Sequence, residues 1–165
     1  MAFRQAPGPN SQVLVGKKVP DFSVESFPAG GFQLAKQVGK TIILYFYPKD
    51  DTPGCTLEGH DFNRLQKQFA SLNTVIYGIS RDSVKSHEKF INKCGYRFPL
   101  LSDSGELVCQ LFAVIKEKNM YGKKVFGIER STFIIGPDQK LIAEFRKVKA
   151  EGHAEDMLKY LQDLN

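Results

Sequence analysis

Apolar and polar positions along this 165-residue chain follow two different periodicities, one typical of strands and one typical of helices. Apolar runs rich in β-branched and aromatic residues predict four strands, at 41–47, 74–80, 131–135 and 141–145. The last two strands flank the turn signal Gly136-Pro137-Asp138-Gln139-Lys140, so we expect them to form a β-hairpin.

Helical spacing of apolar residues fills most of the chain between these strands. The first expected helix begins near Cys55 and carries one apolar face. Its apolar residues are three or four positions apart: Phe62, Leu65, Phe69 and Leu72. Further helices are expected at 83–94, 105–114 and 152–164. In the last of these we expect four residues to face inward: Met157, Tyr160, Leu161 and Leu164.

This order of elements predicts an α/β fold, with a central mixed β-sheet flanked by helices on both faces. The near-continuous apolar strand at 42–47 suits the centre of such a sheet. With 42% hydrophobic residues the chain can build one domain with a real core. We expect a flexible N-terminal extension over residues 1–15 and a single domain over residues 16–165.

The segment 48–55, which directly follows the strand at 42–47, carries the clearest chemical signal. Thr52 suits a helix N-cap, because its hydroxyl can accept from an N–H two or three residues on. Pro53 then occupies the first helical position and Cys55 the third. A thiolate at that place is favoured by the helix dipole and by the free N–H groups of the first turn. The pattern predicts a redox or nucleophilic site.

The three cysteines, Cys55, Cys94 and Cys109, are too few and too far apart for a secreted disulfide framework. They form no Cys-x-x-Cys pair, and their spacing does not suit a zinc site. Thiols that work in a reducing compartment fit better, so we expect a cytoplasmic protein without a metal.

Net charge and hydropathy narrow the class of partner. A net charge of +5 is modest, and the lysine-rich segment 116–124 is expected to be a solvated loop, so no nucleic-acid partner is predicted. No apolar run approaches the roughly 18 residues of a membrane span, so no membrane partner is predicted either.

The motif Pro48-x-x-x-Thr52-x-x-Cys55 resembles the active-site signature of peroxiredoxins. The longer string from Tyr45 to Thr56 is similar to the Q subfamily, also called bacterioferritin-comigratory proteins, and so are the segments 98–103 and 129–135. The resemblance implies a thioredoxin-like fold and thiol-dependent reduction of hydrogen peroxide and organic hydroperoxides, with no cofactor. It also implies a monomer and a reductant of the thioredoxin or glutaredoxin/glutathione type.

Four residues receive roles from this resemblance. Cys55 would be the peroxidatic nucleophile and become a sulfenic acid. Thr52 would place its hydroxyl against the peroxide and the thiolate, Pro48 would shield the thiolate from water, and Arg130 would hold the thiolate and the transition state. An arginine suits that role because it stays charged and offers a rigid planar fork. An ordinary ion pair of Arg130 with Glu58 or Glu129 is the alternative.

The second thiol of the reaction departs from the subfamily pattern. Many members carry a resolving cysteine five residues after the first, where this chain has His60, and others carry it on the next helix, in the register of Ile91. Cys94 lies about one turn beyond Ile91, on nearly the same face. Three outcomes stay open: Cys94 resolves, an outside thiol attacks directly, or Cys109 or a second chain takes part. For Cys109 we expect a buried, unreactive position.

A disulfide from Cys55 to either cysteine requires local unfolding if the Cα atoms are more than about 7 Å apart. Gly54 and Gly59 weaken the helix and favour such opening. Two other functions stay open. A general disulfide oxidoreductase would normally carry a second thiol on the same turn, and a redox-sensing holdase chaperone would use Cys55 only as a switch.

Overall fold

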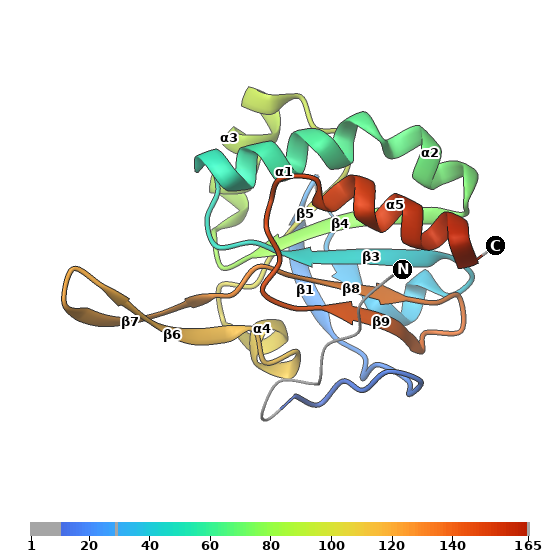
Figure 1. The fold of residues 1–165 in the computed structure, drawn as a ribbon, viewed down its shortest axis with the longest axis horizontal. Coiled ribbons are helices and arrows are strands. Elements are labelled where there is room, and N and C mark those ends of the chain that lie inside the picture. The colour runs from blue at the N-terminus through green and yellow to red at the C-terminus, as the bar shows by residue number, and fades with distance from the viewer. Residues whose placement is uncertain (1–10, 29, 165) are drawn as a thin grey trace.

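The structure, a computed structural model, describes residues 11–28 and 30–164. A seven-stranded mixed sheet runs through the molecule in the order β2-β1-β5-β4-β3-β8-β9 (Figure 1). Its strands are β1 (Ser23–Phe27), β2 (Phe32–Gln33), β3 (Thr41–Phe46), β4 (Thr74–Ser80), β5 (Leu100–Ser102), β8 (Ser131–Ile135) and β9 (Leu141–Phe145).

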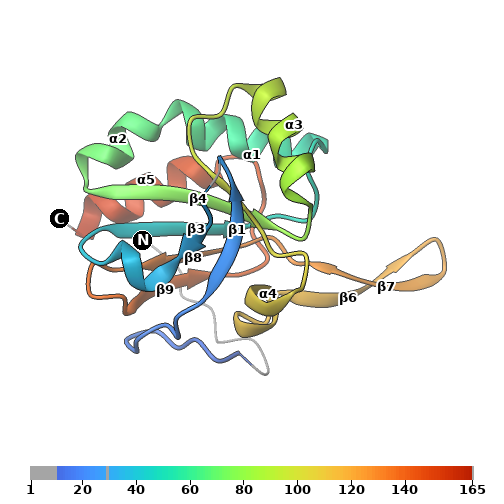
Figure 2. The same cartoon turned by 180° about the vertical axis from the view of Figure 1, so that it is seen from behind.

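Helices cover both faces of this sheet, as predicted. One face carries α1 (Pro53–Arg64), α2 (Gln66–Ser71), α3 (Val84–Cys94) and α5 (His153–Leu164) (Figures 1 and 2). The other face carries the short α4 (Leu107–Leu111) and the N-terminal segment, and a 3₁₀ turn (Leu34–Gln37) follows β2. Each face buries its own apolar core, and Cys55 belongs to the core under α1, α3 and α5.

The central position of β3 explains its unbroken apolar sequence. It pairs in parallel with β4 and antiparallel with β8, so both its edges are bonded and both its faces are covered. Its carboxyl end leads through a short loop into α1, which places the N-terminus of α1 at the sheet edge where sites form in open α/β folds. The predicted strands are confirmed, but the sequence pattern missed β1, β2 and β5 of this sheet.

The helices differ from the prediction in three places. The helix expected from Cys55 to Leu72 breaks at Leu65, which leaves the helical backbone geometry. The break still leaves Phe62 and Phe69 in one core, with ring centroids 5.9 Å apart, so the apolar face survives the bend. Helix α4 is shorter than the expected 105–114. The prediction for Leu164 was wrong, because this residue in the last turn of α5 is 52% exposed.

The lysine-rich segment is a β-hairpin and not the expected loop. Strands β6 (Ile115–Met120) and β7 (Lys123–Ile128) pair antiparallel and project from the domain (Figure 1). The tip residue Tyr121 is fully exposed. None of the described helices is long and apolar enough to cross a membrane.

The packed part of the chain begins before the predicted boundary at residue 16. Val13 is fully buried, and the backbone N–H of Gln12 donates to the carbonyl of Leu111 at 3.0 Å. Residues 11–15 therefore belong to the domain. The rest of the predicted extension, residues 1–10, lies outside the described residues.

Candidate active site

Cys55 occupies the third position of α1 and is buried, with 2% of its surface exposed. Pro53 stands at the first helical position and Thr52 is the N-cap residue, as predicted. The capping hydrogen bond predicted for Thr52 is wrong, because no N–H of α1 donates to its hydroxyl; the hydroxyl instead donates to the carbonyl of Lys49 at 2.8 Å. The turn that brings this carbonyl close includes Asp51 in the left-handed region, at φ 60°. The hydroxyl therefore satisfies the loop and not the helix.

Arg130, the residue just before β8, reaches the sulfur of Cys55. Its Nη2 lies 3.4 Å from the Sγ of Cys55, and its Nη1 forms an ion pair with the carboxylate of Glu58. The backbone carbonyl of Arg130 accepts from the N–H of Val148 at 3.0 Å, which fixes the residue just before β8. Gly54 leaves room for the guanidinium, since a Cβ there would lie 3.2 Å from Nη2. The two alternatives for Arg130, thiolate partner and ion pair, are thus realised together.

At this site one guanidinium, that of Arg130, contacts two acidic groups: the thiol of Cys55 and the carboxyl of Glu58. Burial works against the charge of Arg130, but Glu58 and Cys55 together raise its pKa above the usual value, so it stays protonated. Burial raises the pKa of Glu58 to about 7, although Arg130 acts in the opposite direction. The second oxygen of Glu58 is buried and has no hydrogen-bond partner among the described residues. The full positive charge of Arg130 is therefore available to Cys55 whenever Glu58 is protonated.

His153, at the start of α5, lies close to this cluster and was missed in the sequence. Its Nε2 is 2.7 Å from the hydroxyl of Thr132. Burial, and then the charge of Arg130, lower the pKa of His153 to about 4. The ring is therefore neutral at pH 7 and adds no second positive charge. No spacing or motif near residue 153 marks it as part of a site.

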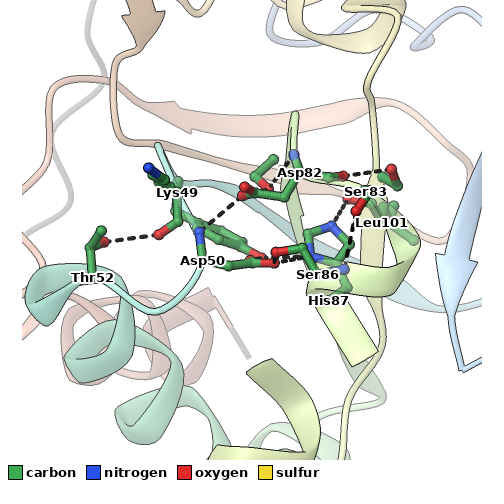
Figure 3. A network of polar contacts seen from close by, with 11 residues as sticks. Lys49, Asp50, Thr52, Asp82, Ser83, Ser86, His87 and Leu101 are labelled. Carbon is green, nitrogen blue, oxygen red and sulfur yellow. Dashed lines mark hydrogen bonds and ion pairs between the residues drawn. The ribbon is translucent and has the colours of Figure 1, made fainter. Parts of the chain in front are cut away.

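A buried polar network holds the loop between β3 and α1 (Figure 3). The carboxylate of Asp50 accepts from the hydroxyls of Tyr47 at 2.6 Å and Ser86 at 2.8 Å, and it faces Nδ1 of His87 at 2.7 Å. On the other side of the ring, Nε2 of His87 is 2.8 Å from the carbonyl of Leu101. A carbonyl only accepts, so Nε2 of His87 is the donor in this contact.

This network fixes the loop residues on either side of Asp50. The backbone N–H of Asp50 also donates at 2.9 Å to the carboxylate of Asp82, two residues beyond the end of β4. Pro48 and Thr52 therefore belong to a loop tied to β4, α3 and β5 (Figure 3). The sequence does not reveal that this loop is held by buried contacts, because Asp50 lies in a polar run that is typical of an exposed turn.

The other two cysteines have different surroundings, and all three thiols are free. Cys94 is the last residue of α3, is partly buried, and packs against the same core as Cys55. Cys109 is fully buried, as predicted, and its backbone N–H donates to Asp103 at 2.7 Å. Burial, with Asp103 beside it, raises the pKa of the Cys109 thiol far above its usual value. His60, at the position of the usual resolver, is exposed on α1.

The chain is similar to known proteins over most of its length. The model of the AhpC/TSA family matches residues 15–144. Peroxiredoxin Bcp of Xanthomonas campestris is 53% identical over 136 residues, which cover 81% of this chain and 85% of that protein. Peroxiredoxin Bcp of Bacillus subtilis is 43% identical and covers 93% of this chain and 98% of its own length.

Solved structures agree with this assignment. Peroxiredoxin Q of Xanthomonas campestris superposes with a TM-score of 0.85 at 45% identity, covering 93% of this chain and 98% of that one. A structure of the bacterioferritin comigratory protein of the same organism, solved for its alkyl peroxide reduction activity, gives a TM-score of 0.83 at 48% identity and covers 87% and 91%. The chain therefore belongs to the AhpC/TSA family, as a peroxiredoxin of the Q, or bacterioferritin-comigratory, type with a thioredoxin-like fold.

Proposed function

We propose that this peroxiredoxin reduces hydrogen peroxide and organic hydroperoxides through the thiol of Cys55. One observation carries the proposal: Nη2 of Arg130 lies 3.4 Å from a sulfur in the first turn of α1. A thiolate is the reactive form of cysteine, and both the helix N-terminus and the guanidinium favour it. The alkyl peroxide reduction described for the Xanthomonas campestris relative supports the choice of substrate.

The chemistry is a displacement at oxygen. The Cys55 thiolate attacks one peroxide oxygen, an S–O bond forms and the O–O bond breaks, and Cys55 becomes a sulfenic acid. The other oxygen leaves with the electron pair and takes up a proton, which gives water or an alcohol. Arg130 stabilises the negative charge that spreads over the sulfur and both oxygens. Since the ion pair with Glu58 already holds the guanidinium in place, little reorganisation is needed.

Thr52 and Pro48 complete the proposed peroxide site. The hydroxyl hydrogen of Thr52 is used by the carbonyl of Lys49, which leaves the oxygen lone pairs free to accept from the O–H of a peroxide. Pro48 is half-buried at the start of the same loop and would limit the access of water to the thiolate.

For recycling we propose Cys94 as the resolving thiol. It attacks the sulfenic sulfur of Cys55, an S–S bond forms, and the S–O bond breaks with loss of water. A dithiol reductant of the thioredoxin type, or a glutaredoxin/glutathione system, then reduces the disulfide. We expect the enzyme to act as a cytoplasmic monomer, and the reaction as written needs no metal or cofactor.

Replacement of each cysteine tests this proposal. Cys55→Ser should abolish peroxide consumption with the fold intact by circular dichroism, whereas Cys109→Ser should leave consumption unchanged. Cys94→Ser should still form a sulfenic acid but lose the disulfide seen by peptide mass spectrometry after one equivalent of hydrogen peroxide. Turnover near wild type in Cys55→Ser would overturn the proposed function. An intact disulfide in Cys94→Ser would overturn only the choice of resolver.

A further inference from the structure

Tyr96, just after α3, binds the helix that carries the reactive sulfur. Its phenol donates to the backbone carbonyl of Thr56, one residue after Cys55, at 3.0 Å. The residue is 5% exposed, and its ring stacks on Phe98 with centroids 5.3 Å apart and planes 15° apart. The phenol is therefore held rigidly against the first turns of α1.

Gly59 makes this close approach possible. A Cβ at position 59 would lie 2.3 Å from the phenol oxygen of Tyr96, well inside any real contact. The ring of His60 packs edge-on against the same phenol ring, with centroids 5.5 Å apart. Tyr96 thus contacts Thr56, Gly59 and His60, the part of α1 that directly follows the reactive cysteine. Gly59 matters here for the space it leaves, in addition to its weak helix propensity.

Cys55 and Cys94, the two thiols of the proposed cycle, both affect the pKa of the Tyr96 phenol. Burial raises the pKa of Tyr96 far above its usual value, and the charge and hydrogen bond of Cys94 and the charge of Cys55 act in the same direction. The phenol therefore stays protonated and remains a donor to Thr56. Cys94 is only two residues away along the chain.

We propose that Tyr96 is a positioning residue that keeps the start of α1 wound and sets how fast oxidised Cys55 meets a second thiol. The inference rests on the proposed function. Because Cys55 is 2% exposed, a second thiol reaches its sulfur only when the first turns of α1 unwind. Unwinding must break the hydrogen bond from Tyr96 to Thr56 and move Gly59 away from the phenol. Until then the sulfenic acid stays enclosed, where further peroxide oxidises it to sulfinic acid.

Tyr96→Phe tests this inference, because it removes the hydroxyl and keeps the ring. Rapid-quench mass spectrometry resolves sulfenic acid formation from disulfide formation after mixing with hydrogen peroxide. We expect the first step to be unchanged and the second to be about fivefold faster, the effect of one lost hydrogen bond. At excess peroxide the ratio of sulfinic acid to disulfide should fall by a similar factor. Where the wild-type sulfenic acid persists, glutathione is added as the second thiol and the same acceleration is expected.

Two further variants separate this role from general loosening of the fold. Tyr77→Phe also removes a phenol, one that donates to Gln37 at 3.4 Å, and it lies against the opposite core. It should change neither step. Gly59→Ala should act like Tyr96→Phe, because the new Cβ displaces the phenol. A second step at the wild-type rate in both Tyr96→Phe and Gly59→Ala would overturn the inference. Absence of the first step in the wild type would instead overturn the proposed function.

Discussion

Glu58 and His153, on either side of Arg130, should make opposite contributions to stability as pH changes. Burial raises the pKa of Glu58 from 4.5 to about 7. The folded state then holds this proton more tightly than the unfolded chain. The stabilisation is complete below about pH 4.5 and is lost as the pH rises through about 7. Two and a half pKa units correspond to about 3 kcal/mol, of which about 2 to 3 kcal/mol falls between pH 5 and 8.

His153 has the opposite sign. Burial lowers its pKa from 6.5 to about 4, so the folded state holds this proton less tightly than the unfolded chain. Its stabilisation is present above about pH 6.5 and is lost as the pH falls through about 4. Between pH 8 and pH 5 that loss is about 2 kcal/mol. In the wild type the two contributions nearly cancel over this range.

Urea unfolding of the reduced protein, followed by circular dichroism at pH 5, 6, 7 and 8, measures both contributions. Glu58→Gln removes the first, so its stability should fall by about 2 kcal/mol more than that of the wild type from pH 8 to pH 5. His153→Gln removes the second, so its stability should rise over the same interval relative to wild type. The constant cost of each substitution does not affect these slopes. Slopes parallel to the wild type in both variants would refute the reasoning.

Three further predictions concern single contacts. Arg130→Lys loses the two-pronged contact with Cys55 and Glu58, so Cys55 oxidation in stopped flow should slow on the order of a hundredfold, and a loss below threefold would contradict this. Asp50→Ala leaves the buried hydroxyl of Tyr47 and Nδ1 of His87 without their partner, which should cost about 2 kcal/mol in urea unfolding; a cost under about 0.5 kcal/mol would disagree. Cys109 should resist iodoacetamide in the native protein and react in urea, so labelling of the native form would show that its burial is wrong.

Local patterns in the sequence were enough to predict the central strands and the start of the helix that carries Cys55. The continuous apolar residues of β3 and β4 predict buried strands, because a strand covered on both faces needs no polar alternation. Pro53 at the first helical position placed Cys55 in the first turn of α1, because a proline there sacrifices no hydrogen bond. These conclusions hold at the level of a few neighbouring residues. Strands β1, β2 and β5 and the break at Leu65 were not predicted, since pairing partners and packing define them.

Only the tertiary structure decided what surrounds the sulfur. Arg130 reaches Cys55 from 75 residues away, and the sequence suggested that contact through a family resemblance and not through any local pattern. The burial of Asp50 against His87, and the placement of Tyr96 over Gly59, depend on how α3 packs beside α1. Hydrogen bonds and pKa shifts of this kind arise from burial and from charges brought together by folding. Local sequence patterns therefore predict neither these hydrogen bonds nor these pKa shifts.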